Sequence, residues 1–313
     1  MNPWSVFWRQ GHSTTFGDWF KQGYDGAVAD WWQSILQESR SGLAVVEVAC
    51  GNCSLLPAMA NSGVTGKYIG VDIAQVSPSE VAKTAVSGSD IELVLHPETG
   101  AERIPEPDGS ADLVASVYGI EYSDLNRSVP EAARILKPGG RFCALVHHDD
   151  SIVTTMSRRA ISEFNSDELG EAIEALAAIS SERDRVSNLA ELKYSQKAEK
   201  GRIKINALAE KYLSDTNPAT ANATMFEFMT QALKFFKMMG ASSRQRSDFI
   251  TSLEAEHRAS HERFQQMISV ALDADGVEAL EKTMKNAGFC EVTVDVLRSG
   301  EDILAWALRA RKK

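Results

Sequence analysis

The sequence predicts an α/β fold in which helices cover both faces of a doubly wound, mostly parallel sheet. The segment LAVVEV at 43–48 is β-branched and apolar throughout, as expected of a strand buried on both faces. Further strand segments at 67–72, 91–95 and 111–117 alternate with helical segments, which is typical of parallel α/β sheets. The chain has 313 residues, enough for one catalytic domain and an additional one.

The first predicted strand leads directly into a turn and then a helix over 54–62. Gly51 lies in this turn, where the absence of a side chain lets a ligand approach the backbone. Asp72 ends the second strand, 21 residues beyond Gly51. A carboxylate at that position accepts hydrogen bonds from both hydroxyls of an adenosine ribose. The unit therefore predicts a ligand that contains a nucleoside.

Charge near the turn separates two kinds of nucleoside ligand. A dinucleotide fingerprint needs glycine at three positions, and here these are Ala49, Gly51 and Ser54. Glu47 would also lie close to a negatively charged pyrophosphate, which is unfavourable. The same carboxylate suits a ligand with sulfonium and ammonium groups, as in S-adenosylmethionine. The residues therefore favour a methyl donor.

The elements that follow have recognisable signals at their ends. Ser77-Pro78-Ser79-Glu80 predicts a helix start with a serine N-cap, a proline in the first turn and a capping-box glutamate. Ser128-Val129-Pro130-Glu131 predicts a second such start, and its helix is expected to stop at the proline and glycines of 137–140. A fifth strand follows at 141–147. The remaining predicted elements are a helix at 276–287 and strands at 290–297 and 302–310.

Four segments, in order, resemble the motifs of the class I S-adenosylmethionine-dependent methyltransferases. The first has an acid followed by small residues at alternate positions, and the resemblance covers about half of the chain. The segments are VVEVACGNC at 45–53, IPEPDGSADLVASVYGIEYSD at 104–124, EAARILKPGGRFCALV at 131–146 and the C-terminal residues 280–312. The resemblance implies S-adenosyl-L-methionine as cofactor. It also implies a seven-stranded Rossmann-like sheet of order 3-2-1-4-5-7-6 with one antiparallel position.

The resemblance assigns cofactor binding to residues at the ends of several strands. They are Glu47, Ala49, Gly51, Asp72, Ile73, Ala101, Glu102 and Tyr118. Two residues depart from the family pattern at the turn: Ala49 replaces the first glycine and Cys53 the third. Gly100 stands where the family often has an acid that reads the adenine amino group. Adenine is therefore expected to contact backbone groups or Glu98.

The acceptor is expected beyond the fourth and fifth strands. Because the sulfonium already makes the methyl group electrophilic, the protein needs to supply placement, exclusion of water and a base. The candidate catalytic residues are His148, His147, Glu121 and Tyr122. Histidine titrates near neutral pH and Asp149 would orient it, so His148 is the first choice of base, with His147 as substitute. For either histidine, capping of a strand end is the structural alternative.

The chain divides into three predicted parts. Residues 1–40 are rich in aromatic side chains and are expected to form a lid segment. Residues 41–150 and 276–313 form the S-adenosylmethionine-binding methyltransferase domain. Residues 151–275 have few strand signals and repeated helical spacing, which predicts a helical cap inserted after the fifth strand. An apolar stripe over 225–239 is expected to be core; a substrate pocket and a homodimer contact are its alternatives.

Composition limits the classes of partner. The net charge is −10, and a nucleic-acid enzyme usually presents a basic face, so a nucleic-acid partner is not expected. No apolar segment reaches the roughly 18 residues of a membrane span. The N-terminus does not resemble a signal peptide, so a cytoplasmic protein is expected. No metal site is expected, because the C-x-x-C at 50–53 and the pair His257 and His261 each lack further ligands at suitable spacing.

These inferences predict methyl transfer to oxygen or nitrogen of a small organic acceptor enclosed by the helical cap. Two alternatives stay open. One is a methyltransferase that acts on transfer RNA or a peptide; for transfer RNA, the lysine-rich stretch over 193–204 would be the contact. The other is a non-catalytic cofactor-binding protein.

Overall fold

The computed structural model describes residues 2–38 and 41–313, and only the backbone of Asp18 and Trp19. The ends of the predicted lid segment, residues 1, 39 and 40, lie outside the described residues. The chain forms two compact units. One contains the residues up to 157 together with those from 266 onward, and the other contains 158–265.

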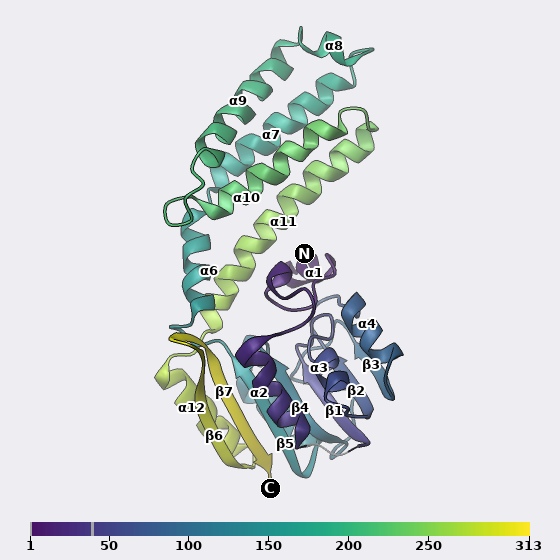
Figure 1. Ribbon diagram of the computed structural model, residues 1–313, viewed down its shortest axis with the longest axis vertical. Coiled ribbons are helices and arrows are strands. Elements are labelled where there is room, and N and C mark those ends of the chain that lie inside the picture. Colours follow the sequence, from purple (N-terminus) through teal and green to yellow (C-terminus); the bar gives the residue numbers. More distant parts are fainter. Residues whose placement is uncertain (1, 39–40) are drawn as a thin grey trace. The chain divides into compact units, whose positions relative to one another are not determined.

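Within the described residues, the first unit contains one seven-stranded sheet of order β3-β2-β1-β4-β5-β7-β6 (Figure 1). The first five strands are parallel, and β7 is antiparallel to both β5 and β6. The predicted fold and strand order are confirmed. The strands are β1 Leu43–Val48, β2 Gly66–Val71, β3 Ile91–His96, β4 Ala111–Val117, β5 Leu136–Val146, β6 Phe289–Ser299 and β7 Asp302–Lys312.

Helices cover both faces of the sheet because neighbouring residues of each strand point to opposite sides. Val45 of β1 belongs to an apolar cluster with Trp32 of α2 and Leu56 of α3. Val46 belongs to a second cluster, with Met284 of α12. The flanking helices are α2 Gly26–Gln37, α3 Leu56–Asn61 and α4 Glu80–Ser87 on the first face, and α5 Leu125–Ile135 and α12 Ala274–Asn286 on the second. The carboxyl ends of β1, β2, β4 and β5 therefore meet at one edge between these layers.

The predicted start of α4 is two residues too early. Ser79, not Ser77, is the N-cap, and its hydroxyl accepts a hydrogen bond from the amide of Ala82 at 3.2 Å. The amide of Ser77 instead donates to Asn52 Oδ1 at 3.2 Å. The residues before the helix thus fasten to the turn after β1.

The predicted capping box at 128–131 is wrong. Asp124 caps α5 one turn earlier, where its carboxylate accepts from the amide of Asn126 at 3.1 Å. Ser128 consequently lies inside the helix, is buried, and accepts a hydrogen bond from the hydroxyl of Ser123. β5 also begins at Leu136, earlier than predicted, with an irregularity in its pairing between Ala111 and Leu113. This irregularity accommodates the proline and glycines of 137–140.

The segment before the sheet contains the short helices α1 Pro3–Trp8 and η1 Gly17–Phe20, followed by α2. A further short helix, η2 Ile120–Tyr122, follows β4. None of the described helices combines the length and the apolar character that crossing a membrane requires.

The second unit is helical. Its elements, with the helices α6 and α11 that run into it from the first unit, are α6 Ile152–Glu163, α7 Ser166–Arg183, α8 Leu189–Leu192, α9 Gln196–Leu213, α10 Ala223–Ala232, η3 Leu233–Met238 and α11 Ser243–Val270. The stripe predicted over 225–239 supplies much of its core: Phe228 and Phe235 are fully buried. Phe236 is the exception and is 37% exposed. The core interpretation of the stripe is therefore confirmed.

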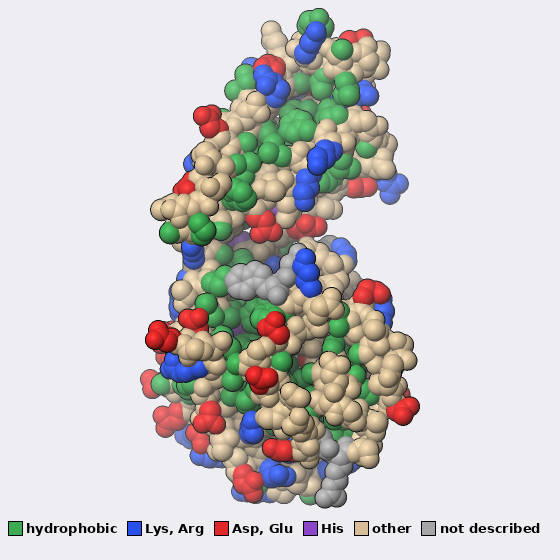
Figure 2. Space-filling model, viewed as in Figure 1, with side chains coloured by type: hydrophobic (Ala, Val, Ile, Leu, Met, Phe, Trp, Pro, Cys, Tyr) green, Lys and Arg blue, Asp and Glu red, His purple; other side chains and the backbone are tan. Residues whose placement is uncertain are grey.

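Charged side chains of both signs are interspersed on the face of the molecule in Figure 2. In the lysine-rich stretch 193–204, Arg202 pairs with Glu199, and Lys204 pairs with Glu171 at 2.9 Å. These pairs reduce the positive charge that this stretch offers to a phosphate backbone.

Candidate active site

The turn between β1 and α3 has an unusual backbone. Ala49, Gly51 and Cys53 all have positive φ angles, of 53°, 52° and 68°. Only glycine adopts this conformation without steric cost. At Gly51 a second constraint adds to the first, because a Cβ atom placed there would lie 2.3 Å from the indole ring of Trp8.

Asp72 connects this turn to the loop after β2. Its carboxylate accepts hydrogen bonds from the amides of Gly51 and Ala74, both at 2.8 Å. The side chain is buried, and burial raises the pKa of its carboxyl group to about 6. The structure thus brings together the two residues from which the sequence predicted a nucleoside ligand.

Glu47 lies beneath the turn and is fully buried. It accepts hydrogen bonds from the Ser54 hydroxyl at 2.7 Å, from the Leu55 amide at 3.2 Å and from the Tyr68 hydroxyl. Burial raises the pKa of the Glu47 carboxyl group to about 7. Its direct contacts are therefore with protein donors, and it supports the start of α3.

The loops after β2 and β3 lie side by side. The amide of Thr99 donates to the carbonyl of Asp72 at 2.8 Å, and the amide of Glu98 to that of Ala74 at 3.2 Å. Ile73 is 66% exposed beside the buried Asp72. Ala101 and Glu102 are half-buried, and Glu102 accepts from the Asp124 amide at 3.0 Å. The exposed side chain of Ile73 offers an apolar surface to a flat base. The neighbouring carboxylate of Asp72 offers hydrogen-bond acceptors to the sugar attached to that base.

Glu121, in η2, lies at the carboxyl ends of β4 and β5. Its Oε1 accepts a hydrogen bond from the amide of His147 at 2.8 Å. Its Oε2 is buried and has no hydrogen-bond partner within the described part of the chain. Burial raises the pKa of the carboxyl group to about 7. Near neutral pH this group therefore exists in both protonation states.

His147 follows β5 and is buried next to two tyrosines. Its ring centroid lies 4.9 Å from that of Tyr118, and its Nε2 lies 3.3 Å from the hydroxyl oxygen of Tyr122. Its Nδ1 is buried and, among the described residues, has no hydrogen-bond partner. Burial lowers the pKa of this imidazole to about 3, so it is neutral at pH 7. Glu121 is the stronger proton acceptor of the two.

His148 points away from this group because successive residues of an extended chain face opposite sides. Its ring stacks on Trp306 of β7, with centroids 4.3 Å apart. Its Nδ1 accepts from the amide of Asp150 at 3.0 Å, and burial lowers the pKa of the ring. The structure thus gathers Glu121, Tyr122 and His147 and places His148 apart from them.

The sequence indicated an aromatic segment at the N-terminus but not that Trp4 and Trp8 reach the site. Trp8 is buried against Gly51, and Trp4 lies edge-on to Tyr122 with centroids 5.4 Å apart. The ring of His12 stacks on Phe7, with centroids 4.4 Å apart. Spacing alone carries no signal for these contacts, since they depend on how a short helix folds back across the sheet edge.

The two residue pairs weighed as metal ligands, at 50–53 and at 257–261, have other surroundings in the structure. The cysteines at 50 and 53 are buried free thiols, and burial raises the pKa of Cys50, which disfavours the reactive thiolate. His257 contacts Gln231 Oε1 at 3.3 Å, and His261 stacks on Phe164. Across residues 2–38 and 41–313, no three metal-binding side chains come together.

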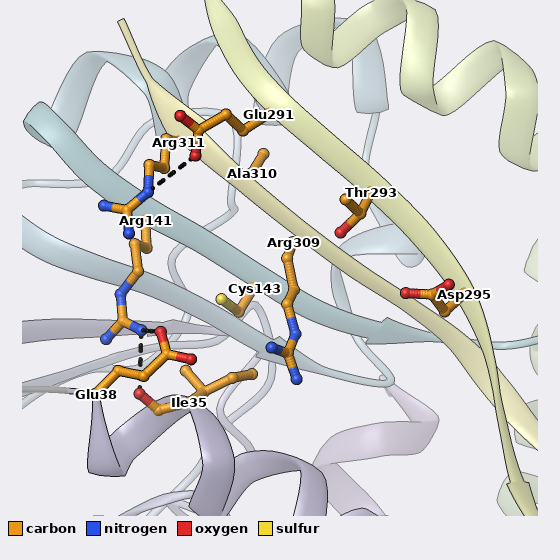
Figure 3. A pocket seen from close by; sticks show the side chains of 10 residues that line it. All are labelled: Ile35, Glu38, Arg141, Cys143, Glu291, Thr293, Asp295, Arg309, Ala310 and Arg311. Atoms are coloured by element: carbon orange, nitrogen blue, oxygen red, sulfur yellow. Dashed lines mark hydrogen bonds and ion pairs between the residues drawn. The ribbon is translucent and has the colours of Figure 1, made fainter.

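A cavity of about 480 Å³ lies elsewhere, against α2 and strands β5, β7 and β6 (Figure 3). Its lining contains none of the candidate site residues. Arg141 pairs with Glu38 at 2.9 Å, and Arg311 with Glu291 at 3.2 Å. This groove is therefore largely neutralised by its own ion pairs.

The family match lies in the part of the chain that forms β1 to β5. Residues 46–144 match a family model described as a methyltransferase domain. The chain is 36% identical over 92 residues to an uncharacterized methyltransferase, YcgJ, of Bacillus subtilis strain 168. This alignment covers 29% of this chain and 36% of the relative. It is also 36% identical over 110 residues to a demethylmenaquinone methyltransferase of Symbiobacterium thermophilum, which covers 34% of this chain and 43% of the relative.

The chain thus spans less than half the length of these curated relatives. Among solved structures, a Thermotoga maritima protein described as an S-adenosylmethionine-dependent methyltransferase and possible histamine N-methyltransferase is 15% identical. The alignment covers 99% of this chain and 100% of that one, with a TM-score of 0.40.

Proposed function

We propose that this chain, which carries a class I S-adenosylmethionine-dependent methyltransferase domain, transfers the methyl group of S-adenosylmethionine to an oxygen or nitrogen atom of a small organic acceptor. The observation that carries this proposal is the bond between the Gly51 amide and Asp72 at the ends of β1 and β2. It joins a glycine that a ligand can approach to a carboxylate suited to ribose hydroxyls.

The charge of the crevice favours a cationic ligand. Three buried carboxyl groups, those of Glu47, Asp72 and Glu121, lie along this edge, and burial raises the pKa of each. A sulfonium and an ammonium group would stabilise their charged forms, whereas a pyrophosphate would oppose them. This difference supports S-adenosylmethionine over a dinucleotide.

Four residues are proposed to hold the cofactor directly. Asp72 would bind the ribose hydroxyls, Ile73 would contact the adenine base and Gly51 would allow close approach of the backbone. Tyr118, at the end of β4, would form the wall toward the acceptor. When bound, S-adenosylmethionine supplies an electrophilic methyl group, so these residues need only orient it and exclude water.

Glu121 is proposed as the proton acceptor for the substrate. Its Oε2 is unpaired, and the pKa of about 7 suits a base that works near neutral pH. The hydrogen bond from the His147 amide fixes Oε1 and leaves Oε2 for an O–H or N–H group of the acceptor. Tyr122 and His147 would position that acceptor through the hydroxyl and the free Nδ1.

The helical unit is proposed to enclose the acceptor. The chain leaves the first unit after residue 157, in α6, and re-enters it at residue 266, in α11, so the insertion follows β5, beyond which the acceptor is expected. Within the first unit, Gln266 at the return point accepts a hydrogen bond from the Trp4 indole at 2.9 Å. Trp4 in turn contacts Tyr122.

Carbon is a second candidate for the methylated atom. It is favoured by the similarity of this domain to a demethylmenaquinone methyltransferase and to proteins named ubiquinone/menaquinone biosynthesis C-methyltransferases. That similarity covers at most 34% of this chain, so it supports the methyl-donor half of the reaction more than the acceptor.

Isothermal titration with S-adenosylhomocysteine and with NAD tests the ligand. We expect binding of the adenosyl compound alone, and at least about tenfold weaker binding in Asp72→Ala, which removes the ribose contact. Asp108→Ala, an exposed aspartate paired with Arg134, is the matched control. An extract of small metabolites incubated with a labelled methyl donor then identifies the acceptor. Preference for NAD, or no binding of either compound, would contradict the proposal.

A further inference from the structure

The segment from residue 2 to residue 12, here called the N-terminal strap, lies on the loops after β1 and β2. These two loops border the proposed cofactor crevice. Its central feature is Trp8, which is only 4% exposed. The indole ring covers Gly51 so closely that a Cβ there would be 2.3 Å from it. Trp8 and Phe7 also form an apolar cluster with Ala74, two residues beyond Asp72.

Hydrogen bonds fasten the strap to the same two loops. On the side of β1, the Asn52 side-chain amide donates to the carbonyls of Trp8 at 2.8 Å and His12 at 3.0 Å. On the side of β2, the amide of Gln75 donates to the Ser5 hydroxyl at 2.9 Å. Both Asn52 and Ser5 are buried, so these bonds are shielded from competing water.

The position of Trp8 conflicts with a ligand that crosses Gly51. The glycine supplies free space above the turn, and the indole already fills that space. The two carboxylate oxygens of Asp72 already accept hydrogen bonds, one from the amide of Gly51 and one from the amide of Ala74. Ile73, beyond the strap, is still open to solvent. The adenine end of the crevice is thus accessible, whereas the part that runs over Gly51 is covered.

We propose that the N-terminal strap is an autoinhibitory plug: the Trp8 indole occupies part of the cofactor crevice, and S-adenosylmethionine binds only when the strap withdraws. This inference rests on the proposed function for the identity of the ligand. It goes beyond that function by stating whether the segment strengthens or weakens cofactor binding. A lid closes over a bound ligand and strengthens binding, whereas a plug competes with the ligand and weakens it.

The strap also connects the cofactor crevice to the acceptor side. Trp4 stacks on Trp8 with centroids 6.3 Å apart, touches Tyr122 and donates to Gln266. Withdrawal of Trp8 therefore disturbs the Trp4 ring, which lies edge-on to Tyr122. An acceptor that takes the place of Trp4 at Tyr122 would release the plug and promote cofactor binding.

Hydrogen–deuterium exchange of the intact chain tests, without a mutation, whether the strap is a plug that the ligand displaces or a lid that closes over it. Peptides covering residues 2–12 should exchange faster when S-adenosylhomocysteine is bound, because the ligand displaces the strap. Slower exchange, as a closing lid would give, or unchanged exchange at saturation would overturn the plug.

Two variants test the same point by calorimetry. Trp8→Ala removes the indole, and Ser5→Ala removes the anchor to Gln75 without altering either loop. If the strap is closed in about nine of ten molecules, each should bind S-adenosylhomocysteine up to about tenfold more tightly. Trp31→Phe, on α2 beside Arg309 and outside the crevice, should leave binding unchanged.

The outcomes separate the two proposals. Weaker binding by both strap variants, with melting temperatures showing that they are folded, overturns the plug while the proposed function stands. Tighter binding by both strap variants than by the unaltered chain supports both. Absence of binding in every variant overturns the proposed function and the plug together.

Discussion

The carboxylate of Glu121 and the backbone amide of His147 are joined by a 2.8 Å hydrogen bond that links the loop after β4 to the end of β5. The bond holds one carboxylate oxygen and leaves the other buried and unpaired in the described structure. One side chain therefore combines a structural role with the role of proton acceptor proposed above, and the two should respond differently to substitution.

The pH dependence of stability should report the buried charge of Glu121. Its pKa lies at about 7 in the folded chain, above its ordinary value of 4.5, so the folded state binds more protons between these values. Its contribution to the unfolding free energy is present below pH 4.5 and is lost as the pH rises toward 7. In Glu121→Gln this loss is absent. Relative to the unaltered chain, the variant should gain up to about 3 kcal/mol between pH 5 and pH 8 in urea unfolding. A constant difference across this range would contradict the burial of a titrating group.

Glu121→Gln, which should stabilise the fold as the pH rises, should lower the rate of methyl transfer. A proton acceptor must be ionised, so turnover of the unaltered enzyme should rise with pH around 7. Glu121→Gln should remove that rise and lower turnover by about 100-fold or more. Exposed Glu92 offers a matched control, since Glu92→Gln removes a charge on β3 far from the site. A carbon acceptor that needs no proton transfer would leave the variant close to the unaltered rate.

Gly51→Ala should strain the turn after β1 and disturb the packing of Trp8 against it. An alanine at φ 52° costs about 1–2 kcal/mol, and the added methyl group collides with Trp8. We expect a lower melting temperature and loss of S-adenosylhomocysteine binding. The double variant with Trp8→Ala relieves the collision, so it should recover part of the stability while binding stays lost. Full stability in the single variant would show that the turn can relax.

In the helical unit, Phe228 and Phe236 allow a matched comparison. Phe228 is fully buried and Phe236 is 37% exposed. Phe228→Ala should lower the unfolding free energy of this unit by about 3–5 kcal/mol, because it leaves a cavity in the core. Phe236→Ala should cost far less. If Phe236 instead contacts the acceptor, its replacement should raise KM without changing the melting temperature, and circular dichroism with steady-state kinetics distinguishes these cases.

The strands were predictable because each has a largely apolar segment bounded by turn residues, and their order was implied by the resemblance to class I methyltransferases. Asp72 and Gly51 were predictable for the same reason, since a parallel sheet places such positions at one edge. The helix starts were less predictable. Both Asp124 and Ser128 can cap a helix, and only packing decides which does, so the start of α5 was misplaced.

The roles of the two histidines depended on geometry that spacing does not contain. Adjacent residues after β5 face opposite ways, and which of them meets Tyr122 follows from the register of β5 with β7. Burial then makes His147 a weak base and Glu121 a stronger one. The contact between Trp8 and Gly51 joins residues 43 positions apart without any periodic signal, and only the folded chain reveals it.

The strand order has a consequence for biosynthesis. β7, made after every other strand described, lies between β5 and β6, so the sheet stays open at β5 until the final strand leaves the ribosome. Until then the helices of 158–265 can already assemble, while the unpaired backbone of β5 invites pairing with other chains. Nascent chains stalled before residue 302 should therefore be the species that recruits chaperones.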